Sequence, residues 1–324
     1  MDYFSGWCKS NRALHGCTVV VTGCNTGIGK ETAKDLYARG ARVIMACRDV
    51  NKAVVAKADI EKDKETVNGT GEIVIEKLDL CSFKSVKDFA LKLLSREEKI
   101  NILINNAGVM MCPENKTEDG FETHIGSNHF SHALLTLLLL PRMIISAPSR
   151  ILFVSSYLHE RFELDLEDIN FDKTPYDPYK AYCRSKAANI LFAKALANKL
   201  KEHDVTNVTT YSLHPGVIRT DIGRHFDKTV WYGASWAFNN LLGLFLKSPQ
   251  CGAQTTIYCA VDEDCADESG LYYCDCAVKN PSKQCQSDDE AGKLWEITLK
   301  SIKINTKTYN PFGQLDPTKE SFIL

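Results

Sequence analysis

Tyr182 and Lys186 are the residues of this sequence whose types and spacing best suit proton transfer. Side chains four residues apart lie on one face of a helix, so the phenol and the ammonium can reach the same cleft. A phenol with an ordinary pKa of about 10 is a poor base near neutral pH, and each unit of lowering needs roughly 1.4 kcal/mol of preferential phenolate stabilisation. A nearby cation supplies such stabilisation. The pair predicts a general acid or base assisted by a lysine, although the same spacing is common on exposed helices.

A glycine-rich turn near the N-terminus is suited to binding a pyrophosphate. The apolar run CTVVVTG (17–23) leads into the turn, and a segment of helical spacing follows as far as Arg39. Glycines let a ligand approach the backbone at a helix N-terminus, and a side chain in their place would block the turn or the contact between helix and strand. Such turns also occur without ligands. This one predicts a dinucleotide site made by Gly23, Asn25, Thr26, Gly27, Ile28 and Gly29.

The residues after the next two strands indicate which dinucleotide would bind. In NAD sites an acid at the end of the second strand accepts hydrogen bonds from the adenine ribose, whereas a 2′-phosphate needs a cation. This sequence has Cys47 and Arg48 there, so NADP(H) is favoured over NAD(H), unless Arg48 is a solvated loop arginine. Lys30 is a second candidate cation. Asp79, with its neighbour Leu80, is expected to contact the adenine unless it only caps a helix.

Alternating strands and helices must position these residues. Apolar, β-rich runs alternate with segments of helical spacing, and Asp49, Ser82 and Asp177 are suited to cap helices. Strands that are apolar along their whole length and joined by helices indicate a parallel sheet covered on both faces. We therefore predict an α/β fold, a doubly wound Rossmann fold with a seven-stranded parallel sheet flanked by helices on both faces. Strands are expected at 17–23, 41–47, 72–78, 100–106, 150–156, 207–214 and 270–275, and helices at 27–39, 49–64, from 82, 120–140, 179–201, 252–261 and from 287.

Length and composition fit one globular α/β domain. The 324 residues are 44% apolar and 25% charged, which are ordinary values that exclude disorder, collagen and coiled coil. No linker rich in Pro, Gly or Ser divides the chain before Pro281, so we predict a single domain over 1–324, with a core at about 14–278 and a C-terminal helix and loose tail over 287–324. With 39 basic and 41 acidic residues, the net charge of −2 argues against nucleic acid as a partner.

The number of cysteines and the N-terminal residues indicate in which cellular compartment the protein is expected. Thirteen is an odd number of cysteines for a disulfide framework, and the first residues lack the apolar core of a signal peptide. The two most apolar stretches, 133–140 and 231–246, are shorter than the ~18 residues that a spanning helix needs. We expect reduced thiols and a cytoplasmic protein, or one peripheral on a cytosol-facing membrane. No set of histidines and cysteines has metal-ligand spacing, so we expect no metal.

Three motifs, in their order along the chain, resemble those of the short-chain dehydrogenase/reductase family. They are TGCNTGIG at 22–29, NNAG at 105–108 after the fourth strand, and YCRSK at 182–186. The resemblance covers about residues 14 to 278. Within the family, ACRDVNK, INNAGVMMCPENKTEDGFE, YCRSKAANILF and HPGVIRTD are similar to the retinol dehydrogenase branch. This resemblance implies an enzyme that acts on retinoids and other apolar aldehydes or alcohols.

The resemblance also implies roles for residues near the strand ends. It places the active serine at Ser156, with Ser155 as the alternative. It assigns to Asn128 the asparagine that shapes a helix and holds a water of a proton relay, although the neighbours of Asn128 depart from the usual pattern. Lys186 would hold the nicotinamide ribose as well as assist Tyr182. The remaining cofactor contacts that the resemblance implies are Asn106, Ala107, Gly108, Pro215, Gly216 and Thr220.

Residues and resemblance together predict an NADP(H)-dependent oxidoreductase that interconverts apolar aldehydes or ketones with alcohols of the retinal and retinol kind. A steroid or xenobiotic carbonyl reductase is the alternative enzyme, and a catalytically silent NADP-binding regulatory protein is the alternative outside enzymes. The aromatic, apolar segment 231–246 is expected to roof the substrate site and is a candidate for peripheral membrane contact, unless it is a core helix. A homo-oligomer is a candidate assembly.

Overall fold

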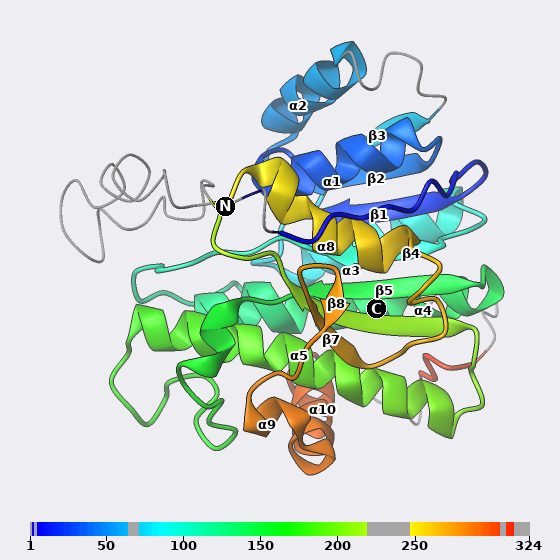
Figure 1. Ribbon diagram of the computed structural model, residues 1–324. Helices are drawn as coiled ribbons and strands as arrows, with labels where there is room; N and C mark the ends of the chain where they lie inside the picture. The colour runs from blue at the N-terminus through cyan, green and yellow to red at the C-terminus, as the bar shows by residue number, and fades with distance from the viewer. Residues whose placement is uncertain (1, 3–4, 64–70, 219–246, 305–308, 314–324) are drawn as a thin grey trace.

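The computed structural model describes residues 2, 5–63, 71–218, 247–304 and 309–313 (Figure 1). Thr220 and the apolar segment 231–246 lie outside these residues, so their predicted roles stay predictions. None of the described helices is both long and apolar enough to cross a membrane.

One twisted sheet runs through the molecule, and its strand order is β3-β2-β1-β4-β5-β6-β7-β8 (Figure 1). The predicted seven strands, β1 to β7, are all parallel. The prediction omitted β8, a two-residue strand that pairs antiparallel with β7 at the edge. The strand order reverses between β1 and β4, which is where open α/β sheets bind ligands. The strands are β1 Thr18–Thr22, β2 Arg42–Cys47, β3 Glu72–Lys77, β4 Ile102–Asn105, β5 Ser149–Val154, β6 Val208–His214, β7 Leu271–Cys274 and β8 Ala277–Val278.

Helices cover both faces of the sheet, and each face has its own apolar core. On one face the core takes buried residues from α1 (Gly27–Ala38), α2 (Val50–Lys62) and α8 (Pro249–Val261). On the other face it takes them from α3 (Phe83–Arg96), α4 (Ser131–Ile145), α5 (Pro178–Glu202) and α10 (Asp288–Ser301). The short helices η3 (Tyr157–Glu160) and α9 (Lys283–Gln286) lie in the connections after β5 and β8. The fold is therefore the doubly wound one that the sequence predicts.

The three predicted side-chain caps lie where helices begin. The predicted caps Asp49, Ser82 and Asp177 precede α2, α3 and α5, and each side chain accepts a backbone N–H of the first turn. Pro178 occupies the first position of α5, where its missing N–H costs no hydrogen bond. The start of α5 is thus well defined, and with it the position of the helix face that carries Tyr182 and Lys186.

The helix predicted at 120–140 is interrupted in its first half. Ile125–Phe130 form a π-helix (η2), and α4 begins only at Ser131. Hydrogen bonds in a π-helix reach five residues back, so its side chains depart from the 3.6-residue pattern on which the prediction depends. Single π-helical turns occur frequently at functional sites. This one contains Asn128.

Residues 309–313, the last that the structure describes, pack against two helices. Pro141 lies inside α4 and has no N–H to offer the carbonyl of Leu137. The hydroxyl of Tyr309 donates to that carbonyl at 2.8 Å and replaces the missing bond. Phe312 packs against Trp295 of α10, with ring centroids 6.3 Å apart. Tyr309 and Phe312 therefore pack against α4 and α10, while the predicted loose tail over the rest of 305–324 lies outside the described residues.

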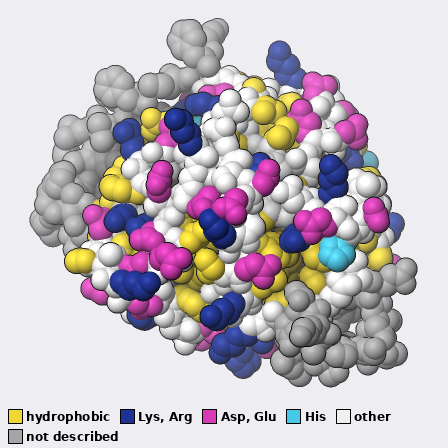
Figure 2. All heavy atoms as spheres, turned by 90° about the horizontal axis from the view of Figure 1, so that it is seen from below, with side chains coloured by type: hydrophobic (Ala, Val, Ile, Leu, Met, Phe, Trp, Pro, Cys, Tyr) yellow, Lys and Arg dark blue, Asp and Glu magenta, His cyan; other side chains and the backbone are white. Residues whose placement is uncertain are grey.

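Charges of both signs are mixed on the side of the molecule near α10 (Figure 2). Lys293 pairs with Asp289 at 2.6 Å, and Lys194 of α5 pairs with Asp288 at 3.2 Å. Opposite charges are thus paired on this side, in keeping with the near-neutral composition.

Candidate active site

Gly23 and Gly29 shape the turn between β1 and α1. Gly23 has a φ of +64°, which residues with a side chain rarely adopt, and a Cβ there would lie 2.7 Å from the Cβ of Ala107. A Cβ at Gly29 would lie 2.5 Å from the Nδ2 of Asn106. The glycines therefore let the NNAG turn after β4 pack directly on the turn after β1. The other predicted residues of the motif, Asn25, Thr26, Gly27 and Ile28, lie in the same turn or at the start of α1.

Thr22, the last residue of β1, joins the two motifs by hydrogen bonds. Its Oγ1 accepts the backbone N–H groups of Asn106 at 3.0 Å and Ala107 at 2.9 Å. The side chain of Asn106 donates in return to the carbonyls of Thr22 at 2.8 Å and Gly23 at 3.2 Å. Sequence reasoning missed this role of Thr22, for which the available signal was its place directly before Gly23.

His132, fully buried in α4, connects Thr22 to Asn128. Its Nε2 lies 2.9 Å from Thr22 Oγ1, and its Nδ1 lies 3.0 Å from the Asn128 carbonyl. Two backbone N–H groups already donate to Thr22 Oγ1, so this oxygen has no lone pair left for a further donor. We therefore infer that the Thr22 hydroxyl donates to His132 Nε2, which is nearer than the carbonyl of Ile104 at 3.4 Å. The Nδ1–H then donates to Asn128. Burial lowers the pKa of His132 to about 4, which keeps this ring neutral near pH 7.

Asn128, in the π-helix, spans the space between the NNAG turn and α5. Its Oδ1 accepts the N–H of Val109 at 2.9 Å, and its Nδ2 donates to the carbonyl of Val109 and to the Oγ of Ser185, both at 3.0 Å. Gly108 stands at the meeting point, since a Cβ there would lie 3.6 Å from the Oδ1 of Asn128 and 3.3 Å from the Nζ of Lys186. The structure thus brings Asn128 and Lys186 together from separate elements.

Tyr182 and Lys186 lie on one face of α5 and are both buried, with exposed fractions of 4% and 2%. The Nζ of Lys186 donates to the carbonyl of Val154 at 2.9 Å and lies 5.8 Å from the centre of the Tyr182 ring. Burial raises the pKa of Tyr182 to about 12, while a hydrogen bond with Ser156 acts in the opposite direction. Burial lowers the pKa of Lys186 to about 8. In the protein alone, the phenol therefore keeps its proton near neutral pH.

Ser155 and Ser156, adjacent at the end of β5, have different partners. Ser155 is buried, and its Oγ donates to the carbonyl of Lys186 at 2.6 Å. Ser156 caps η3, where its Oγ accepts the N–H of Leu158 at 3.2 Å, and it also hydrogen-bonds Tyr182. Ser156 is therefore the serine next to the phenol, whereas Ser155 supports the backbone of α5.

A buried cluster that sequence reasoning missed lies beside Tyr182. The ring of His124 meets the ring of Tyr182 edge to face, with centroids 6.3 Å apart. His124 Nδ1 pairs with the carboxylate of Glu122 at 2.7 Å, and its Nε2 accepts the N–H of Cys112 at 3.2 Å. The hydroxyl of Tyr176 donates to the carbonyl of Cys112 at 2.8 Å. This cluster ties the loop after the NNAG turn to the insert before α5, and it supports one side of the phenol.

The ends of β2 and β3 form the outer part of the candidate dinucleotide site. Arg48, just past β2, is exposed, and no described residue forms an ion pair with it. Lys30 instead pairs with Asp59 of α2 at 2.7 Å, so it is already engaged. Asp79 accepts the N–H of Cys81 at 3.0 Å while Ser82 caps α3, so Asp79 is not the cap of that helix. Leu80 follows Asp79 and packs partly against the core.

The turn after β6 lies at the same carboxyl-end edge of the sheet, and the structure describes it as far as residue 218. Gly216 has a φ of +94°, and its N–H donates to the Nδ1 of His214 at 3.0 Å. Pro215 lies between them, so the sequence HPG forms a tight turn at the end of the strand. The predicted contact of Thr220 lies outside the described residues.

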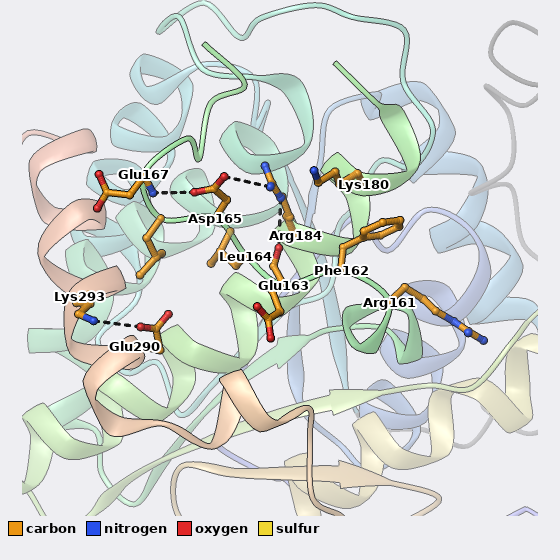
Figure 3. Close-up of a pocket in the computed structure, with 11 residues that line it drawn as sticks. Arg161, Phe162, Glu163, Leu164, Asp165, Glu167, Lys180, Arg184, Glu290 and Lys293 are labelled. Carbon is orange, nitrogen blue, oxygen red and sulfur yellow. Dashed lines mark hydrogen bonds and ion pairs between the residues drawn. The ribbon is translucent and has the colours of Figure 1, made fainter. Parts of the chain in front are cut away.

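A groove of about 700 Å³ lies beside α5, away from these residues (Figure 3). Its lining contains none of the candidate catalytic or cofactor residues. Arg184 pairs with Asp165 at 3.4 Å, and Lys293 with Glu290 at 3.2 Å, so charges that line the groove neutralise one another. The dashed contacts in Figure 3 show this pairing. The groove is therefore not the candidate active site. The lining residues are Arg161, Phe162, Glu163, Leu164, Asp165, Leu166, Glu167, Lys180, Arg184, Glu290 and Lys293.

Comparison with known proteins gives one consistent family. Residues 17–231 match the sequence profile described as short chain dehydrogenase. The chain is 46% identical to human retinol dehydrogenase 11 over 296 residues, which are 91% of this chain and 88% of that protein. It is 44% identical to human retinol dehydrogenase 13 over 305 residues, 93% and 89% of the two chains. A crystal structure of a protein from Mycobacterium paratuberculosis superposes with a TM-score of 0.72 at 29% identity, covering 92% of this chain and 98% of the other. The chain therefore belongs to the short-chain dehydrogenase family, within its retinol dehydrogenase-like branch, and is an oxidoreductase of that type.

Proposed function

We propose that this protein is an NADP(H)-dependent oxidoreductase that interconverts apolar aldehydes or ketones with alcohols of the retinal and retinol kind. The observation that carries the proposal is the meeting of Ser156, Tyr182 and Lys186 beside Gly108. A phenol, a hydroxyl and an ammonium there lie next to the NNAG turn, which packs on the glycine-rich turn after β1. The same edge of the sheet would hold the cofactor and the reacting group of the substrate.

The residues of the turn fit a dinucleotide. Gly27 has a positive φ and no side chain, so a pyrophosphate could approach the backbone at the start of α1, where the helix N-terminus favours its charge. The NNAG turn, with Asn106, Ala107 and Gly108, packs against the glycine-rich turn. Pro215 and Gly216 form the turn after β6, at the same edge of the sheet. Asp79 and Leu80 would contact the adenine. Lys186 would hold the nicotinamide ribose.

Ser156 and Tyr182 would handle the substrate oxygen. A bound nicotinamide dinucleotide supplies or accepts the hydride. In reduction, Ser156 would donate a hydrogen bond to the oxygen and Tyr182 would give it a proton, which the raised pKa of the buried phenol keeps available. In oxidation, Tyr182 would take the proton, and the charge of Lys186 with the Ser156 hydrogen bond would stabilise the phenolate. Asn128 would help return protons to Lys186, since both residues face Gly108.

The preference for NADP(H) is proposed from Arg48. Its guanidinium stands exposed at the end of β2, has no ion-pair partner among the described residues, and replaces the acid that NAD sites use there. A fixed guanidinium forms strong charge-assisted hydrogen bonds with a phosphate. Lys30 supports this preference less, because Asp59 already neutralises it.

The apolar substrate class is proposed from the curated relatives, which are named retinol dehydrogenases, and from the residues around Ser156. Tyr157 follows Ser156 directly and is 36% exposed. An exposed aromatic ring next to the serine that contacts the phenol suits a hydrocarbon chain. The roof and the peripheral membrane contact predicted for 231–246 belong to the same proposal, as do a cytosol-facing location and a homo-oligomer.

The test is turnover of NADPH and of NADH, measured separately with retinal, short aldehydes and steroid ketones. We expect retinal to be reduced with NADPH faster than with NADH. Reduction of steroid ketones alone would favour the alternative enzyme. Binding of NADPH without turnover of any substrate, in protein that is folded by circular dichroism, would favour a silent binding protein and overturn the proposal.

A further inference from the structure

We propose that Cys24 and Cys47 form a covalent modification site in the dinucleotide-binding turn, at which a peroxide converts the two thiols to a disulfide. The formation of the bond is independent of the function proposed above. Its effect on cofactor binding rests on that function. Neither thiol has a part in the chemistry of Ser156, Tyr182 and Lys186.

The two sulfur atoms are already in contact. Their Sγ atoms lie 3.8 Å apart, and both residues are buried, with exposed fractions of 0% for Cys24 and 1% for Cys47. Cys47 is the last residue of β2, and Cys24 lies two residues past the end of β1. The two strands pair in parallel, and the N–H of Gly23 donates to the carbonyl of Ala46 at 2.9 Å. A disulfide has an S–S length of about 2.05 Å, so bonding needs a shift of less than about 2 Å between the sulfurs.

The surroundings of the two sulfurs make them chemically unequal. The two thiols contact each other, and the sulfur of Cys47 also accepts the backbone N–H groups of Cys24 and Asn25. These hydrogen bonds lower the pKa of Cys47 against the effect of burial, whereas burial and the neighbouring thiol raise the pKa of Cys24. The thiolate is the reactive form of cysteine. Cys47 is therefore the sulfur that attacks first, and Cys24 is the resolving one.

The chemistry is balanced with hydrogen peroxide as the oxidant. The Cys47 thiolate attacks one peroxide oxygen, the O–O bond breaks, and the departing hydroxide takes a proton to become water, which leaves a sulfenic acid on Cys47. The Cys24 sulfur then attacks the Cys47 sulfur and loses its proton. The S–S bond forms, the S–O bond breaks, and the second water leaves. Two thiols and one peroxide thus give one disulfide and two waters.

The backbone of α1 packs closely against Cys24, so we expect the new bond to move the turn. A Cβ at Gly29 would lie only 2.9 Å from the Cα of Cys24, and the carbonyl of Gly23 is also within 2.6 Å of that position. Cys24 is directly followed by Asn25 and Thr26, the residues expected to face the pyrophosphate. Drawing Cys24 toward β2 therefore displaces the backbone that would contact the cofactor. The disulfide should weaken dinucleotide binding, and a bound dinucleotide should slow its formation.

The experiment treats the full-length protein with hydrogen peroxide, with and without NADPH, and identifies linked peptides by mass spectrometry without reduction. We expect a peptide pair joined through Cys24 and Cys47 and lighter by two hydrogens. We also expect the dissociation constant for NADPH to rise roughly tenfold and to return to its original value after treatment with dithiothreitol. Cys24→Ala and Cys24→Ser should both abolish the link, and either suffices if the other does not fold. Cys259→Ala, a buried cysteine in α8, is the matched control and should leave the link unchanged.

The outcomes separate this proposal from the proposed function. Absence of the Cys24–Cys47 pair in peroxide-treated, folded protein would overturn the modification site, as would a link that forms only after unfolding in urea. A link that leaves the affinity for NADPH unchanged would overturn the coupling to the turn. If the link forms but the reduced protein does not bind NADPH, the modification site stands and the proposed function fails.

Discussion

The catalytic cluster and the outer edge of the dinucleotide site lie on the same end of one sheet but are supported in opposite ways. Tyr182, Lys186 and Asn128 are buried, and Lys186 and Asn128 are bonded to main-chain groups of other elements. Arg48 is exposed and has no ion-pair partner among the described residues. A substitution in the cluster therefore affects contacts between several elements. A substitution at Arg48 should affect only the binding of a ligand at that position.

This difference separates two properties of the enzyme. Proton transfer needs groups held in position with shifted pKa values, and burial provides both conditions. The choice between two dinucleotides needs only one charge at the right place on a solvated edge. We expect mutations in the cluster to change turnover, and mutations at the edge to change cofactor preference while turnover and stability stay nearly constant.

The largest effect is expected for Tyr182→Phe. Removing the hydroxyl eliminates general acid and base catalysis, which is typically worth about 100- to 10,000-fold in rate. The ring still packs on His124, so NADPH should bind with nearly its normal affinity. Turnover at saturating NADPH is the measurement. Tyr179→Phe, on the same helix, is the control, and a loss of similar size there would point to packing rather than to proton transfer.

The next largest effect distinguishes the two adjacent serines. Ser156→Ala should lower kcat by roughly 100- to 1,000-fold, the usual cost of losing one donor to a developing oxyanion. Ser155→Ala removes a hydrogen bond to the Lys186 carbonyl, so it should lower the free energy of unfolding by about 1 kcal/mol and kcat by less than about tenfold. Steady-state kinetics and urea unfolding of both variants give the ranking. The reverse ranking would move the site by one residue.

Arg48→Gln tests the other side of the comparison. The loss of a charge-assisted hydrogen bond, worth about 1.5 to 3 kcal/mol, should weaken NADPH about 10- to 100-fold and leave NADH nearly unchanged. Lys30→Gln is the matched control, because Asp59 already neutralises that ammonium. Dissociation constants from nucleotide fluorescence give the ratio. Equal losses for both nucleotides would make Arg48 a structural residue.

Much of this arrangement could be predicted from the sequence because it depends on local patterns. Continuous apolar runs located β1 to β7 within a few residues, and the caps located the starts of α2, α3 and α5. Spacing alone put Tyr182 and Lys186 on one face. The motifs then indicated which strand ends meet, since the carboxyl ends of parallel strands share one edge.

The remainder depends on contacts between distant segments, to which no local pattern refers. The link from Thr22 through His132 to Asn128 joins β1 to α4 and depends on a π-helix that breaks the helical period. The two serines after β5 are the same residue type, so only their partners in α5 distinguish them. β8 has just two residues, too few to show a strand pattern. The contact of Cys24 with Cys47 likewise appears only once β1 and β2 are paired.

The smallest expected effect concerns stability at mildly acidic pH and the bridge made by His132. Its folded-state pKa of about 4 lies below the ordinary value of 6.5, so between these values the unfolded chain binds a proton that the folded protein excludes. Stability is therefore lost as the pH falls through this window, by about 1 kcal/mol from this residue between pH 7.5 and pH 5.5. The glutamine of His132→Gln cannot titrate. Between pH 7.5 and pH 5.5, the free energy of unfolding measured in urea should therefore fall by about 1 kcal/mol less in this variant than in the wild type. His203→Gln, at the exposed end of α5, should keep the full loss. If both variants lose as much stability as the wild type, the buried ring is not the group that senses acid, and the assignment of a neutral bridge between Thr22 and Asn128 is wrong.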